Sequence, residues 1–222
     1  MSLQPLSASQ REAIEEATTN YQAALSREAA VYLHERGITA RTASMFRLGS
    51  VFDPFPGHGK FDGFLAIPYL DANGKALTMR FRCIQEHDHR AHGHGKYMSL
   101  PHDPARVFNI GAIHRAKEEI HLTEGEMDTM TLSAMGLPAV AIPGATGWRN
   151  HHRRMLAGFS RVWVWGDPDD AGAQFTAKVT QSLRQAKGVR ITEGDINDVY
   201  RKRGAQAIFD LFQPKEAHAE SP

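Results

Sequence analysis

From about residue 116 onward, the chain alternates short apolar runs with longer amphipathic segments. The apolar runs cover 119–123, 138–142, 161–165 and 189–192, and segments with helical periodicity cover 126–136, 148–157, 170–187 and 196–212. Strands that alternate with helices form a parallel sheet, because each crossover must return the chain to the same end of the sheet. Residues 116–213 are therefore predicted to form an α/β domain with a parallel sheet of about four strands and flanking helices.

Carboxylates directly follow three of these predicted strands. Glu124 follows 119–123, Asp167 and Asp169 follow 161–165, and Asp195 follows 189–192. Because the carboxyl ends of parallel strands share one edge of the sheet, these side chains are expected to meet there. Gathered carboxylates repel one another unless a cation lies among them, and Mg²⁺ prefers oxygen ligands and keeps waters that phosphate can replace. The pattern points to metal-assisted phosphate chemistry.

An acid at a helix start is more often a cap or a partner of the helix dipole than a ligand. That interpretation is preferred for Glu126, Asp170 and Asp198. It is not preferred for the recurring set, because caps need not recur with paired spacing. Asp128, four residues after Glu124, is predicted to orient a metal-bound water.

The first 115 residues lack this alternation and are predicted to form a smaller α+β subdomain. Helical periodicity runs from 9 to about 36, either as one helix or with a break at which Ser26 caps a second helix. Two strand-like runs, 63–70 and 75–84, are separated by Asn73-Gly74, which is a strong hairpin signal. The tail 214–222 is polar and is predicted to be disordered.

Basic residues are concentrated on the second strand of the predicted hairpin and after it. Arg80 and Arg82 share one face of that strand, and Met79 and Phe81 share the other. The alternation suits a half-buried strand that presents guanidinium groups to phosphates, with a solvated charged face as the alternative. A second basic patch covers 149–154. It is equally consistent with contact to template phosphates and with an ordinary solvated surface.

Four histidines, His87, His89, His92 and His94, lie in a glycine-rich loop. Imidazoles at this density bind zinc or nickel. The loop itself contains no cysteine and no strand–helix frame, so a polar loop over a nucleotide pocket is preferred to a structural zinc site. The single cysteine, Cys83, excludes an intrachain disulfide and a cysteine-based zinc finger.

Bulk properties limit the cellular context. The formal net charge is +1, so global charge says little about partners. The N-terminus has no apolar signal segment, and no apolar run reaches the roughly 20 residues that cross a bilayer. A protein of the reducing cytoplasm, without a membrane partner, is expected.

The three acidic motifs resemble the Toprim domain shared by primases, topoisomerases and related nucleases. The motifs are Glu124-Gly125 with Asp128, then Asp167-x-Asp169-x-Ala171-Gly172, then Asp195-x-Asn197-Asp198. The preceding hairpin and the segment 96–99 are similar to the N-terminal subdomain of the catalytic core of DnaG-type and phage primases. The resemblance covers roughly residues 25–212.

The resemblance implies that Glu124, Asp167 and Asp169 are catalytic and hold Mg²⁺ or Mn²⁺, with Asp195 as a further ligand. It also implies a second role for Glu124 as a base, and it places Arg80, Arg82 and Lys96 near nucleotide and template. The implied activity is nucleotidyl transfer, the synthesis of short RNA primers from ribonucleoside triphosphates on single-stranded DNA.

Two other activities remain as alternatives for a chain of this family. One is a metal-dependent Toprim nuclease, and the other is a non-catalytic nucleic-acid-binding replication factor. The family's zinc-binding module and a Walker A motif are absent from this sequence. A replicative helicase and a separate zinc-module protein are therefore expected as partners of a primase core.

Overall fold

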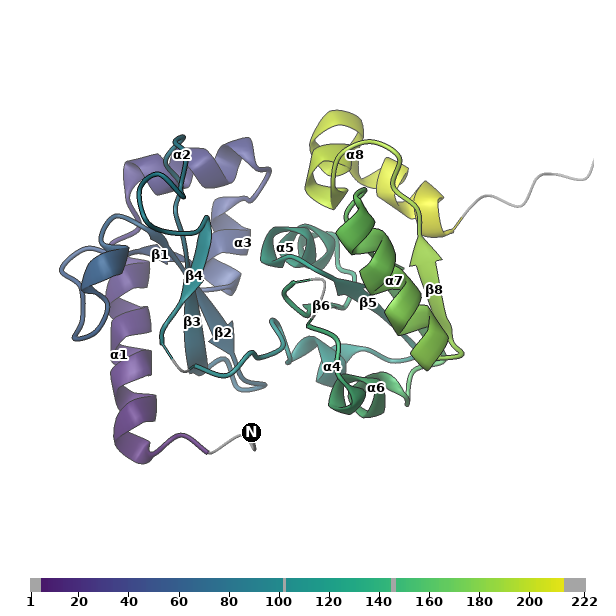
Figure 1. Cartoon of the computed structure of the whole chain (residues 1–222), viewed down its shortest axis with the longest axis horizontal. Coiled ribbons are helices and arrows are strands. Elements are labelled where there is room, and N and C mark those ends of the chain that lie inside the picture. Colours follow the sequence, from purple (N-terminus) through teal and green to yellow (C-terminus); the bar gives the residue numbers. More distant parts are fainter. Residues whose placement is uncertain (1–4, 102, 145–146, 214–222) are drawn as a thin grey trace, which may run out of the picture. The chain divides into compact units, whose positions relative to one another are not determined.

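The computed structural model describes residues 5–101, 103–144 and 147–213, so the predicted disordered tail 214–222 lies outside the described residues. The chain forms two compact units, and the boundary between them follows Arg115. Each unit has its own sheet (Figure 1).

The first unit contains a four-stranded antiparallel sheet in the order β1-β2-β3-β4. Its strands are β1 (Gly49–Ser50), β2 (Leu65–Leu70), β3 (Ala76–Arg82) and β4 (Tyr97–Ser99). Its helices are α1 (Ala8–Ala23), α2 (Arg27–Glu35), α3 (Ala40–Met45), the short 3₁₀ helix η1 (Gly59–Phe61) and α4 (Ala112–Arg115). Helices and an antiparallel sheet together make this the predicted α+β subdomain.

The amphipathic segment near the N-terminus is two helices, so the prediction of one continuous helix is wrong and the alternative with a break is confirmed. The Ser26 hydroxyl accepts a hydrogen bond from the Ala29 amide at 3.0 Å and begins α2. A serine in this position satisfies a backbone donor that the new helix would otherwise leave without a partner.

The predicted hairpin joins β2 to β3. The Asp71 carboxylate accepts hydrogen bonds from the amides of Asn73 (2.8 Å) and Lys75 (3.0 Å), and Gly74 adopts a positive φ of 78°. Side chains on one face of β3 then enter a core against α1, which lies along the sheet in Figure 1. This core contains Ala17, Tyr21, Val51, Phe61, Phe64, Ala66, Met79, Phe81 and Cys83.

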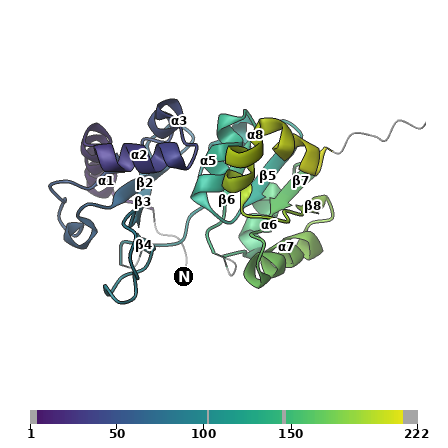
Figure 2. The same ribbon diagram turned by 90° about the horizontal axis from the view of Figure 1, so that it is seen from above.

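The second unit contains the predicted parallel sheet, in the order β6-β5-β7-β8. Its strands are β5 (Glu119–Thr123), β6 (Ala139–Ala141), β7 (Arg161–Trp165) and β8 (Ala186–Val189). Its helices are α5 (Glu126–Ala134), α6 (Asn150–Leu156), α7 (Asp170–Ser182) and α8 (Ile196–Phe212). Figure 2 shows α5 and α8 on one side of this sheet and α6 and α7 on the other, so both faces are covered, as parallel sheets require.

Two boundaries in this unit differ from the prediction. The helix predicted over 170–187 ends at Ser182, and the strand predicted over 189–192 is instead Ala186–Val189. Gly188 therefore lies within a strand and does not end a helix. A Cβ atom at this position would lie 2.6 Å from Cγ2 of Thr176 in α7, so glycine permits the close packing of α7 on β8.

Apolar side chains from α5 and α8 pack on the sheet from one side. The buried members of this cluster are Leu132, Ala139, Trp165, Val189, Ile191, Ile196, Val199, Ala207, Ile208 and Phe212. The backbone of Gly204, with φ 79° and ψ 178°, is not helical and divides α8 into two helical segments. Among the described residues, no helix combines the length and the apolar composition that crossing a bilayer requires.

Candidate functional site

The parallel sheet has a topological switch point between β5 and β7. From β5 the chain continues through α5 to β6 on one side, and from β7 it continues through α7 to β8 on the other. The two strands end together, because Thr123 pairs with Trp165. Ligands bind to open α/β sheets outside the carboxyl ends of strands at such a point. Glu124 directly follows the end of β5, and Asp167 follows the end of β7 after one residue, Gly166.

A hydrogen bond joins the two strand ends. The Asp167 backbone amide donates to Oε1 of Glu124 at 3.2 Å. The turn that carries Glu124 is itself anchored, because the hydroxyls of Thr123 (2.9 Å) and Thr129 (3.1 Å) both donate to the Gly125 carbonyl. The position of the Glu124 carboxylate is thus determined by β5, by α5 and by the loop after β7.

The loop that carries Asp167 packs against the start of α7 without room for side chains. A Cβ atom on Gly172 would lie 2.1 Å from the Asp167 carbonyl oxygen, and one on Gly166 would lie 2.3 Å from the Gly172 carbonyl oxygen. Glycine at both positions therefore permits the close approach of this loop to α7. Asp169 caps the start of α7, where its Oδ1 accepts the Gly172 amide at 2.8 Å.

The carboxylates interact electrostatically. Burial raises the pKa of Glu124 to about 7; the charges of Asp167 and Asp169 act in the same direction, and the hydrogen bond from the Asp167 amide acts against them. Burial also raises the pKa of Asp167, followed by the charges of Asp195 and Asp169. The structure therefore brings together Glu124, Asp167, Asp169 and Asp195, which come from three separate segments of the chain.

Two of these acids are also helix caps. Oδ1 of Asp169 caps α7, and Oδ1 of Asp195 accepts the Asp198 amide at 2.7 Å at the start of α8. Each carboxylate has a second oxygen, so capping and cation binding are compatible. The cap holds the carboxylate in a defined orientation, and the helix N-terminus favours its negative charge.

Asp128 has a different environment. It is buried, with 7 % of its surface exposed, and its Oδ1 accepts the Asn197 backbone amide at 3.1 Å. The side chain of Asn197 donates to Thr131 at 3.0 Å. Asp128 thus ties α5 to the first turn of α8, next to Asp195. Its predicted interaction with a metal-bound water remains a prediction.

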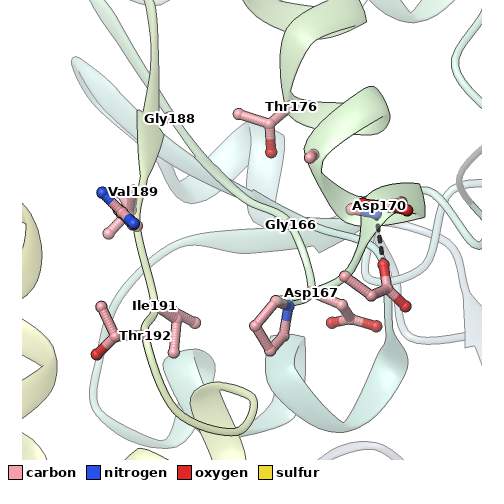
Figure 3. Close-up of a pocket in the computed structure, with 13 residues that line it drawn as sticks. Gly166, Asp167, Asp170, Thr176, Gly188, Val189, Ile191 and Thr192 are labelled. Atoms are coloured by element: carbon pink, nitrogen blue, oxygen red, sulfur yellow. Dashed lines mark hydrogen bonds between the residues drawn. The ribbon is translucent and has the colours of Figure 1, made fainter.

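A groove of about 630 Å³ lies beside the acids (Figure 3). Its described lining comprises Gly166, Asp167, Pro168, Asp169, Asp170, Gly172, Ala173, Thr176, Gly188, Val189, Arg190, Ile191 and Thr192. Arg190 adds a positive charge to a wall that carries three aspartates. Sequence reasoning missed Arg190, since the shifted position of β8 places it at the strand end.

The acids fit a divalent cation by donor chemistry. All of the candidate ligand atoms are carboxylate oxygens, as Mg²⁺ and Mn²⁺ prefer. The raised pKa values of Glu124 and Asp167 also show that their negative charges are incompletely compensated by the protein. Within the described residues, ligand atoms close enough to share one ion are found in the first unit, at Cys83, His87, His89 and His94, and not among these acids. The acidic edge, which we define as Glu124, Asp167, Asp169 and Asp195, is therefore a set of interacting carboxylates and not a closed ion cage.

The basic strand of the first unit differs from the prediction in one respect. Arg82, expected to present its guanidinium group to phosphates, is only 4 % exposed. Its guanidinium carbon lies 4.6 Å from the ring centre of Tyr97 and 5.3 Å from that of Tyr32. Nη1 of Arg82 donates a hydrogen bond to the Tyr97 hydroxyl. The pairing of Arg82 with Tyr97 across β3 and β4 explains this burial. Arg80 is partly exposed and Lys96 is exposed.

Comparison with known proteins identifies a family model and a relative. Residues 121–200 match the family described as Toprim-like. Gene 57 protein of Mycobacterium phage D29 is 32% identical over 155 residues, which are 68% of this chain and 98% of that protein.

Solved structures share the fold of nearly the whole chain. The RNA polymerase domain of Mycobacterium tuberculosis primase DnaG superimposes with a TM-score of 0.76 at 23% identity, over 92% of this chain and 83% of that chain. A DnaG primase catalytic domain bound to single-stranded DNA has a TM-score of 0.67 at 18% identity, over 89% and 78%. At these identities the likeness shows the fold alone.

Proposed function

Because the chain belongs to the Toprim family and has the fold of primase catalytic cores, we propose that it is the catalytic core of a DNA primase. It would join ribonucleoside triphosphates into short RNA primers on a single-stranded DNA template. The proposed activity is that of a nucleotidyltransferase acting in the cytoplasm. A replicative helicase and a separate zinc-module protein are its proposed partners.

The convergence of four carboxylates at the switch point carries this proposal. Glu124, Asp167 and Asp169 would hold Mg²⁺ or Mn²⁺, with Asp195 as a further ligand. When bound, the cation neutralises the charge of the triphosphate and orients the attacking and leaving oxygens. The hydrogen bond from the Asp167 amide and the helix cap at Asp169 orient two of these carboxylates.

The groove beside the acids supports a nucleotide as the ligand. Its volume of about 630 Å³ lies within the range of small-molecule sites. Arg190 lies on its wall, where a guanidinium group would pair with phosphate oxygens. Arg80 and Lys96 of the first unit are proposed to contact phosphates of nucleotide or template, and Arg82 would support them from its buried position beside the rings of Tyr32 and Tyr97.

A template-directed assay tests the proposal. The chain is incubated with single-stranded DNA, labelled ribonucleoside triphosphates and Mn²⁺, and the products are separated by length. Labelled oligoribonucleotides complementary to the template are expected. If the template is shortened and no such products form, the chain is a nuclease. If the template stays intact and no products form although the chain binds DNA, the chain is a non-catalytic nucleic-acid-binding replication factor.

A further inference from the structure

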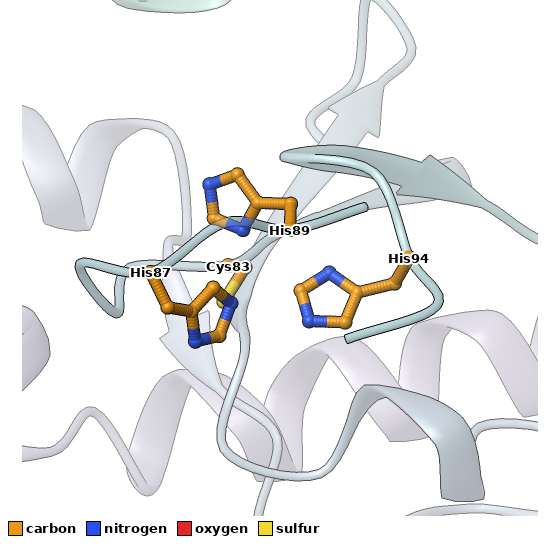
Figure 4. Close-up of side chains that lie close together, drawn as sticks. All are labelled: Cys83, His87, His89 and His94. Carbon is orange, nitrogen blue, oxygen red and sulfur yellow. The ribbon is translucent and has the colours of Figure 1, made fainter. Parts of the chain in front are cut away.

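A second cluster of metal-ligating side chains lies in the first unit, outside the acidic edge. Cys83 directly follows β3, and His87, His89 and His94 lie in the loop that leads to β4. One ligand atom from each of these four residues lies within 4.8 Å of all the others. Figure 4 shows the thiol and the three imidazole rings arranged around a common centre.

The spacing of these atoms approaches that of a tetrahedral site. Sγ of Cys83 lies 3.6 Å from Nε2 of His87. Zinc bonds of about 2.0–2.3 Å to nitrogen and sulfur place tetrahedral ligands about 3.3–3.8 Å apart. One pair of ligands therefore already has this separation, and closing the others requires shifts of about an ångström.

Backbone hydrogen bonds supply the frame that the sequence does not reveal. The Cys83 amide donates to the Lys96 carbonyl at 3.0 Å and so joins the two ends of the loop. The His94 amide donates to the His89 carbonyl at 3.0 Å and draws two of the histidines together. Oδ1 of Asp88 accepts the Arg90 amide at 2.9 Å and shapes the turn between them. Cys83 itself is 3 % exposed and is anchored in the core against α1.

The ring nitrogens of two histidines indicate a ligand. Nδ1 of His94 lies 3.1 Å from the Gly95 carbonyl oxygen, which leaves Nε2 as the atom for a metal. A backbone carbonyl on the other ring nitrogen is usual for metal-bound histidine. Nδ1 of His89 is buried and has no hydrogen-bond partner among the described residues. A buried polar atom without a partner is costly unless something absent from the protein itself satisfies it.

We propose that Cys83, His87, His89 and His94 form a structural zinc site. One thiolate and three imidazoles suit zinc, which takes four such ligands in tetrahedral geometry. Four protein ligands close the coordination shell, so the site would stabilise structure and supply no reaction chemistry. It would fix the connection between β3 and β4, which begins beside Arg82 and ends at Lys96. The zinc site is independent of the proposed primase activity and of the acidic edge.

His92 provides a matched control within the same loop. Its ring stacks on that of His87 at 4.2 Å between centres, and its Nδ1 lies 3.0 Å from the Asp88 carbonyl oxygen. It does not belong to the four-residue group. Removing His92 therefore deletes an imidazole from the loop without deleting a proposed ligand.

The test is the metal content of full-length protein prepared without an affinity tag. After incubation with zinc and gel filtration, we expect about one zinc per chain. His89→Ala should weaken zinc binding at least tenfold, since loss of a ligand costs more than loss of the groups behind it. His92→Ala should keep wild-type zinc content. A chain that retains no zinc, or a His92→Ala variant as impaired as His89→Ala, would overturn the proposal.

Cobalt substitution tests the thiolate directly. The cobalt-loaded protein should show the near-ultraviolet charge-transfer absorption of a cobalt–thiolate bond, which Cys83→Ser should abolish. Because Cys83 is a core residue, circular dichroism checks that Cys83→Ser is folded. His94→Ala replaces a partly exposed ligand in the loop, and its zinc content should fall as in His89→Ala. Cobalt bound without thiolate absorption in the wild type would contradict the site.

Discussion

The backbone amide of Asp167 donates a hydrogen bond to the Glu124 carboxylate at 3.2 Å and thereby joins the carboxyl ends of β7 and β5. These strands flank the point at which the sheet reverses its strand order. The bond holds one acid against the loop that carries the next. Burial raises the pKa of both carboxylates. The charge of Asp167 adds to the effect on Glu124, and the charges of Asp195 and Asp169 add to the effect on Asp167. These neighbouring carboxylates are the basis of the proposed cation site.

Asp167→Asn should nearly abolish primer synthesis. A cation at the reacting phosphate supplies several kcal/mol of transition-state stabilisation, so loss of a ligand should lower the rate at least about 100-fold. The amide side chain is isosteric, and the Asp167 backbone amide still donates to Glu124, so the melting temperature in chelator should not fall. The rate is measured in the template-directed assay at saturating Mn²⁺.

Asp170→Asn is the matched control for this variant. Asp170 lines the same groove and lies in the first turn of α7, but it does not contribute to the raised pKa of Glu124 or Asp167. Its replacement should change the rate less than about tenfold, as expected for a charge that acts mainly on the helix dipole. Equal losses in Asp167→Asn and Asp170→Asn would mean that the groove's charge, and no specific ligand, determines the rate.

Glu124→Gln should reverse a pH-dependent loss of stability. The pKa of Glu124 is about 7 in the folded protein and 4.5 in its ordinary state. Between these values the folded chain binds the proton more tightly than the unfolded chain, so the wild type loses stability as the pH rises through this window. Glutamine does not ionise and escapes this loss.

Thermal melting in chelator checks the effect. The change in pKa from 4.5 to about 7 corresponds to roughly 3 kcal/mol, which solvent screening of this half-buried group reduces to the order of 1 kcal/mol. Glu124→Gln should therefore melt about 2–4 °C above the wild type at pH 8 and at the same temperature at pH 4. Mg²⁺ should raise the melting temperature of the wild type at pH 8, because it binds the folded state, and raise that of the variant less. A variant less stable than the wild type at pH 8 would show that the Glu124 charge is already compensated by the protein.

Asp128→Ala should destabilise the second unit. It leaves the buried Asn197 amide without its acceptor, which costs about 1–3 kcal/mol in the free energy of unfolding. Asp128→Asn keeps an acceptor oxygen and should restore most of this stability. Chemical denaturation measures both variants. If Asp128→Asn is stable but inactive, the carboxylate acts beyond its structural bond, as the predicted role with a metal-bound water requires.

Arg80→Ala and Lys96→Ala should each reduce the salt dependence of single-stranded DNA binding. Loss of one phosphate contact lowers the slope of log K against log salt by about 0.7. Lys75→Ala is the control, since Lys75 is an exposed lysine at the hairpin turn, 3.5 Å from Glu15. Fluorescence anisotropy at several salt concentrations gives the slopes. Unchanged slopes for Arg80→Ala and Lys96→Ala would assign both residues to ordinary surface.

The second unit was largely predictable, because its information is local. β7 has the predicted bounds 161–165, and α8 has the predicted bounds 196–212. Each β-rich run is followed by acids or by glycine and proline, so strand ends are marked in the sequence. The gathering of Glu124 with Asp167 and Asp169 then follows from the parallel topology, since the carboxyl ends of parallel strands share an edge, whereas Asp195 lies at the start of α8, beyond the end of β8.

What the sequence did not reveal depends on contacts between distant residues. Gly188 has the local signature of a helix end, and only the approach of Thr176 explains its place in β8. Arg82 alternates like a surface residue, and only its pairing with Tyr97 across the sheet buries it.

The cysteine and histidine cluster was missed for a similar reason. Cys83 precedes His87 by only four residues but lies outside the glycine-rich loop that carries the histidines. The bond between the Cys83 amide and the Lys96 carbonyl closes the loop and brings the thiol to the imidazoles. The spacing Cys-x₃-His-x-His-x₄-His was the available signal, and reading the cysteine together with the loop would have found it.

The most direct test of the central claim is an anomalous diffraction measurement on a crystal soaked in Mn²⁺. The claim is that carboxylates that follow two strands of the second unit, β5 and β7, share a divalent cation. An anomalous peak is expected at coordination distance, about 2.0–2.3 Å, from carboxylate oxygens of Glu124, Asp167 and Asp169. Ordered manganese bound elsewhere, with these carboxylates ordered and lacking a peak, would contradict it.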